Sequence, residues 1–91
     1  MTEHDALIAE AELGEEARKF MESDLGKVLL GLARQETGLA QIALETVAPT
    51  DIYKITTLQN QAWLGRKFEE WLFELVDKGE SAMNVFRQQQ E

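Results

Sequence analysis

A chain of 91 residues without cysteine fits one domain, and it excludes disulfide bridges and thiolate metal sites. Its net charge of −8 repels phosphate backbones and anionic lipid surfaces, so we expect no nucleic-acid and no membrane partner. No stretch approaches the roughly 20 apolar residues of a transmembrane helix. A domain of this size has a thin core, which association with further subunits often supplements.

The first predicted helix covers residues 4–22, where apolar side chains from Leu7 to Met21 recur at helical spacing. Residues 1–24 hold eight acidic and two basic side chains, a net charge of −6. We interpret this charge as a solvated helix face, with a docking surface for a basic partner as the alternative. Gly14 lies in the middle of the helix, where it could divide it. With no basic segment ahead of an apolar one, we expect no signal peptide.

The second predicted helix covers residues 24–47 and carries an apolar stripe about six turns long. Ser23 is its expected N-cap. Three glycines interrupt it, Gly26, Gly31 and Gly38, and each costs about 1 kcal/mol relative to alanine inside a helix. We therefore expect close approach between helices at these glycines, with local fraying as the alternative and a kink at Gly38.

A turn at Pro49 separates the second helix from a third, which is predicted over residues 51–78. Thr50 can accept a hydrogen bond from the free amides at the start of the third helix. The connection is short, so the two long helices should lie antiparallel. Residues 80–88 keep a helical composition, and the chain either bends or continues as a helix through Gly79.

These elements define an all-α fold in a single domain over residues 1–91. No stretch has the alternation of a strand, and no internal repeat is present. The predicted architecture is an antiparallel helical hairpin of two long helices, with a shorter N-terminal helix and a C-terminal helical segment. The ends, residues 1–3 and 88–91, are expected to fray.

Side chains that could carry chemistry are scarce and scattered. His4 is the only histidine and is followed by Asp5 near the terminus, whereas metal sites and catalytic dyads need several side chains held together. Glu12 and Glu16 lie one turn apart, but a di-metal bundle site also needs inward Glu-x-x-His pairs. No nucleophile motif and no phosphate-binding loop occurs. We expect no catalytic residue, no metal, no cofactor and no enzymatic activity.

The third helix carries an aromatic cluster on an apolar arc that is wider than one partner helix can cover. Most of the cluster can share one face, whereas Trp63 and Phe73 need other neighbours. Three alternatives could bury these aromatic side chains: the N-terminal helix, a second protomer or a different partner protein. The candidate interface residues are Trp63, Leu64, Phe68, Trp71, Phe73 and Leu75.

A polar triplet at residues 59–61 interrupts the same helix. Either all three side chains face solvent, or at least one of them faces the apolar seam. A buried amide in a helical interface fixes register and oligomeric state at some cost in stability.

Several short stretches of the chain resemble a known group of proteins. They are Leu13-Gly14-Glu15, Phe20, Asp24-Leu25-Gly26-Lys27, Ala33 with Glu36, Pro49-x-Asp51, Leu58-Gln59-Asn60, Trp71-Leu72 and Gly79-x-x-Ala82. Together they resemble small helical proteins encoded by tailed phages and prophages, often among genes for virion assembly. The resemblance covers about residues 13–82 and carries over no functional residue, because the group has no established activity. It implies a phage-derived protein made in the bacterial cytoplasm, with a virion-associated location as a second possibility.

These features lead us to expect a non-enzymatic structural or interaction protein. It would act as a homo-oligomer, a dimer or larger, in a phage or prophage assembly role, with a phage or host protein as a further partner. The alternative is an acidic regulatory or inhibitory binder that occupies the basic cleft of a DNA-acting host protein by imitating phosphate charge. Such a mimic should carry its carboxylates along one face of the folded body.

Overall fold

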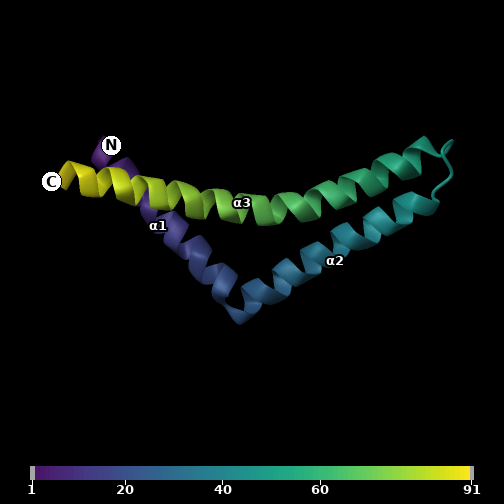
Figure 1. The fold of residues 1–91 in the computed structure, drawn as a ribbon, viewed down its shortest axis with the longest axis horizontal. Helices are drawn as coiled ribbons and strands as arrows, with labels where there is room; N and C mark the ends of the chain where they lie inside the picture. Colours follow the sequence, from purple (N-terminus) through teal and green to yellow (C-terminus); the bar gives the residue numbers. More distant parts are fainter. Residues whose placement is uncertain (1, 91) are drawn as a thin grey trace.

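The computed structural model describes residues 2–90, which form three α-helices: α1 (Glu3–Glu22), α2 (Asp24–Thr46) and α3 (Ile52–Gln90). The all-α prediction is confirmed, since no strand occurs among these residues. Figure 1 shows α1 and α2 meeting at a corner, with α3 running back along both and closing a triangle. The 39 residues of α3 correspond to about 58 Å of helix, close to the 60 Å longest extent of the molecule.

Two glycines that could have interrupted a helix do not interrupt it. Of the two alternatives at Gly79, a bend or a continuous helix, the structure has the continuous helix: α3 extends through Gly79 to Gln90 and includes the segment 80–88. Gly14 likewise does not divide α1, which is continuous. Both glycines are buried where α1 crosses α3, so their role is close contact rather than helix termination. Met1 and Glu91, part of the ends expected to fray, lie outside the described residues.

Side-chain caps explain where the helices begin. Thr2 and Asp5 form a capping box, in which the Asp5 amide donates to Thr2 Oγ1 at 3.2 Å and the Thr2 amide donates to Asp5 Oδ2 at 3.3 Å. Ser23 is the N-cap of α2, as predicted. At α3 the expectation for Thr50 is wrong: the Lys54 amide donates to Asp51 Oδ1 at 3.0 Å, so Asp51 caps this helix.

The corner between α1 and α2 is built around Ser23. Its hydroxyl donates to the Phe20 carbonyl at 2.6 Å and accepts from the Gly26 amide at 3.0 Å, which satisfies one free group of each helix. A Cβ at Gly26 would overlap the Phe20 carbonyl group, so this position requires glycine. Gly26 therefore serves the corner, and the expectation that it mediates contact between packed helices is not the role observed.

The close approaches between helices occur at other glycines than those predicted. A Cβ added to Gly14 would lie 2.7 Å from Gly79 Cα, and one added to Gly65 would lie 2.6 Å from the Ala33 carbonyl oxygen. Gly31 and Gly38 have nothing within 4 Å of the added atom, so the prediction of close packing at them is wrong. The helix α2 is continuous through both.

Small residues therefore occupy most of the buried positions between the helices. The buried apolar residues comprise four alanines and only one larger side chain, Leu30, which is 6% exposed. The alanines are Ala17, Ala40, Ala62 and Ala82. Short side chains let helix backbones approach closely, but they bury little apolar area. The core of one copy is accordingly thin.

Candidate protein interface

Large apolar side chains are concentrated on the surface of this protein. Among residues 2–90, seventeen of them are at least 37% exposed, against the single large side chain in the core. Scattered exposed leucines are normal on a soluble protein, but contiguous apolar patches mark sites of interaction. The arrangement of these side chains on the helices therefore decides whether they form a site.

Two polar contacts define the two sides of the α2–α3 pair. On one side, Arg34 of α2 forms an ion pair with Glu69 of α3, and Arg34 Nε donates to Glu69 Oε1 at 3.1 Å. On the other side, Gln61 Nε2 of α3 donates to Glu36 Oε2 of α2 at 2.8 Å. Arg34 and Glu36 are two residues apart, so they point to different sides of one helix.

Helical spacing places eight large apolar residues on the Glu36–Gln61 side. Residues at steps of three and four share one side of a helix, and the sets 25, 29, 32, 36, 39 and 61, 64, 68, 71, 75 follow those steps. Glu36 and Gln61 touch, so both sets lie on the same side of the pair. We name this surface the apolar face: Leu25, Leu29, Leu32, Leu39, Leu64, Phe68, Trp71 and Leu75.

The apolar face contains four of the six predicted interface residues. Leu64 is 55% exposed, Trp71 48% and Leu75 37%, and Phe68 is half-buried. The N-terminal helix therefore does not cover Trp71, which was one of the alternatives from the sequence. Whether a partner binds here stays a prediction.

The other two predicted residues, Trp63 and Phe73, lie away from the apolar face. Phe73 follows Glu69 by one turn and so lies on the Arg34 side of the pair, 48% exposed. Trp63 is 45% exposed, with Lys67 Nζ 6.0 Å from its ring centroid, and lines a shallow groove with Gln41 of α2. The structure thus divides the aromatic cluster between different surfaces.

Sequence reasoning missed the α2 half of the apolar face. The apolar stripe predicted for the second helix includes Leu25, Leu29, Leu32 and Leu39, which are 63%, 37%, 52% and 52% exposed. The residues that contact α3 are smaller: Thr37 Oγ1 donates to the Ala62 carbonyl at 3.1 Å. The sequence signal for these exposed leucines was the width of the apolar stripe on the second helix, which is greater than one neighbouring helix can cover.

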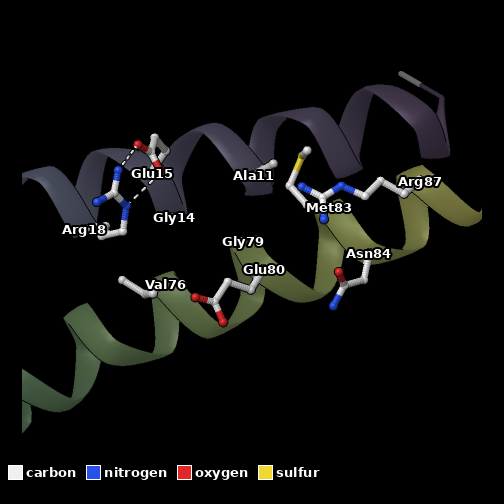
Figure 2. Close-up of a pocket in the computed structure, with 10 residues that line it drawn as sticks. All are labelled: Ala11, Gly14, Glu15, Arg18, Val76, Gly79, Glu80, Met83, Asn84 and Arg87. Carbon is white, nitrogen blue, oxygen red and sulfur yellow. Dashed lines mark hydrogen bonds and ion pairs between the residues drawn. The ribbon is translucent and has the colours of Figure 1, made fainter.

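A hollow also lies where α1 crosses α3, with a volume of about 290 Å³. Figure 2 shows Gly14 and Gly79 facing each other there, Met83 pointing toward α1 and Asn84 pointing away from it. Arg18 on its wall pairs with Glu15 and with Glu22 at 2.9 Å, and these carboxylates raise the pKa of the Arg18 guanidinium. The Arg18 guanidinium therefore binds carboxylates of α1, the helix to which it belongs.

The single histidine of the chain is held in a structural contact. The His4 ring packs on Phe86 with ring centroids 4.6 Å apart, so His4 joins α1 to the end of α3. Within the described residues, no group of three histidine, aspartate or glutamate side chains is placed to hold a metal ion. In the same part of the chain, no helix combines the length and apolarity needed to cross a membrane. Comparisons with protein-family models, curated proteins and solved structures found no match.

Proposed function

We propose that this protein is a non-enzymatic interaction module that works as a homo-oligomer. The main support for self-association is that only one large apolar side chain, Leu30, is buried, whereas seventeen large apolar residues are exposed. Burial of apolar area is the main favourable term in folding and association, at about 25 cal/mol per Å². Seventeen large apolar side chains keep more than a third of their surface exposed within one copy, and a partner surface would cover part of it.

The layered architecture supports the same proposal. Stable domains pack elements in at least two layers around a shared core. The helices α2 and α3 are in contact near Thr37 and Ala62 and diverge toward the corner between α1 and α2 (Figure 1), so each keeps a flank without a neighbour in the chain. A second copy would provide the missing layer.

The biological setting of the proposal is phage or prophage virion assembly, in the bacterial cytoplasm or on the virion. Its support is the resemblance of the stretches between residues 13 and 82 to small phage-encoded helical proteins. Self-association suits such a role, because particles are built from repeated copies with symmetric contacts. Mass spectrometry of purified particles and assembly intermediates from the encoding strain tests this setting. Absence of the chain from every such fraction would contradict it.

The oligomer itself is tested by the mass of the full chain in solution. Light scattering after size exclusion should give a multiple of the 10.3 kDa chain mass at micromolar concentration. The mass should fall toward one chain on dilution if the association is reversible. If the mass stays that of one chain up to about 100 µM, the binding free energy between copies is weaker than about −5.5 kcal/mol. That result would refute the proposal.

An acidic binder of a basic host protein is the second candidate, and one observation favours it. Glu12 and Glu16 of α1 are exposed, and neither forms an ion pair with any residue between 2 and 90. Capture of a DNA-acting enzyme that is lost on Glu12→Lys with Glu16→Lys would support this role. Most of the acidic excess, −6 of the net charge of −8, lies in residues 1–24, which fits a local docking site better than an extended mimic of a phosphate backbone.

A further inference from the structure

We infer that the apolar face binds the same face of a second copy, so that two α2–α3 pairs form a four-helix interface. This inference rests on the proposed self-association and names its surface. It departs from the sequence-based set of six residues, because it excludes Trp63 and Phe73 and adds the four leucines of α2. Three features of the face point to a second copy as the occupant.

The first feature is the available area. The exposed fractions of the seven most exposed residues of the face, Phe68 left aside, amount to about three and a half whole side chains. At about 200 Å² for each large apolar side chain, one copy offers about 700 Å². A standard protein–protein interface takes about 800 Å² from each partner. The face therefore has the size that a stable dimer needs, before any rim contact is counted.

The second feature is the pattern of contacts on each helix. A helix in a four-helix bundle packs against two neighbours, so it carries two adjacent stripes at steps of three and four. On α2, Ala33, Thr37 and Ala40 form the stripe that contacts or faces α3. The adjacent stripe comprises residues 25, 29, 32, 36 and 39, and its four leucines are 37–63% exposed. On α3, the large apolar residues Leu64, Trp71 and Leu75 of the corresponding stripe are 37–55% exposed. Each helix of the pair thus has one occupied stripe and one partly exposed stripe.

The third feature is charge. Copies with a net charge of −8 repel each other, but all charged residues of the chain except one lie outside the two stripes that form this surface. Within the two stripes Glu36 is the only charged residue, and Gln61 donates a hydrogen bond to its carboxylate. A surface with so little charge is matched by another uncharged apolar surface, and this chain itself carries one.

The two tryptophans provide a matched test. They lie on the same helix and are almost equally exposed, 48% for Trp71 and 45% for Trp63, but only Trp71 belongs to the apolar face. In sedimentation equilibrium on the full chain, Trp71→Glu should weaken self-association about a hundredfold, as loss of a central aromatic anchor does. Trp63→Glu should change it less than about threefold. Far-UV circular dichroism checks that both variants keep the helix content of the parent.

A second measurement avoids the introduced charge. In Trp63→Phe the only indole is Trp71, and its emission should shift to the blue as protein concentration rises through the association range. In Trp71→Phe the only indole is Trp63, and its emission should not move. If the parent is oligomeric, two results would show that the wrong face was chosen and would leave the proposed self-association intact. One is an equal emission shift in Trp63→Phe and Trp71→Phe. The other is a larger loss of self-association in Trp63→Glu than in Trp71→Glu. A parent chain that stays monomeric would overturn the proposed function as well.

Discussion

The crossing of α1 and α3 makes the substitution Gly14→Ala an exacting test of the packing. The added Cβ would lie 2.7 Å from Gly79 Cα and 2.7 Å from the Leu75 carbonyl oxygen. Real Cβ atoms do not approach other atoms so closely, and both neighbours are backbone atoms, which no rotamer change can move aside. The helices α1 and α3 would have to separate, and the packing around Ala17 and Ala82 would loosen with them.

Two opposed terms set the magnitude. Replacing glycine by alanine inside a helix stabilises it by about 1 kcal/mol, because glycine loses more backbone entropy on folding. Forcing an additional methyl group into a tight contact costs about 1–3 kcal/mol, and here the rigid neighbours favour the upper part of that range. We therefore expect Gly14→Ala to lower the free energy of unfolding by about 1–2 kcal/mol.

Gly31→Ala is the matched control, because the same methyl group meets nothing within 4 Å. It should raise the free energy of unfolding by about 0.5–1 kcal/mol through helix propensity alone. Urea unfolding followed by far-UV circular dichroism measures both, at one fixed protein concentration because association couples stability to concentration. If Gly14→Ala stabilises the chain as Gly31→Ala does, the close crossing of α1 and α3 is wrong.

Three further substitutions test the corner, the ion pair and the apolar face. Ser23→Ala removes the N-cap of α2 and should cost about 1 kcal/mol in urea unfolding, whereas Ser23→Asp should restore most of it. Arg34 lowers the pKa of the Glu69 carboxyl, so their pairing stabilises the fold above the unfolded-state pKa of about 4.3 and is lost as pH falls through the lower folded-state value. Arg34→Gln should therefore lower the urea midpoint at pH 7 but not at pH 2, and an equal loss at both would refute this. Glu36→Leu removes the only charge from the two stripes and should tighten self-association about tenfold in sedimentation equilibrium. It should also broaden the range of oligomers, because Gln61 loses the Glu36 carboxylate that accepts its hydrogen bond. Weaker association of Glu36→Leu would contradict the placement of Glu36 in the interface between copies.

The starts of the second and third helices could be predicted because local chemistry marks them. The N-cap at Ser23 and the turn around Pro49 are each recognisable within a few residues. The role of a glycine is not recognisable in this way. Gly31 and Gly79 both lie in helix-forming sequence, yet only Gly79 meets another backbone. Which glycine lies at a crossing depends on where two helices meet in space, and no single helix contains that information.

The candidate interface was predictable in part for the same reason. The spacing of Leu64, Phe68 and Trp71 placed them together without knowledge of the partner helix, and the structure keeps them on one side. The leucines of α2 belong to a single predicted stripe, because sequence spacing does not distinguish two adjacent stripes. The contact between Glu36 and Gln61 resolves them, and it joins residues 25 positions apart.

The thin core and the open apolar face have one physical origin. The backbones of α2 and α3 approach so closely at Gly65 and Ala33 that this part of the seam has no room for a larger side chain at Gly65. Leucines adjacent to that seam must then lie on the flanks, where a second helix layer can reach them. Enlarging Ala62 in the seam would push the helices apart and let the flanking leucines turn inward, at the expense of the apolar face. The small residues that pack the helices of one copy together therefore also leave the large apolar side chains on the surface, where a second copy can bind them.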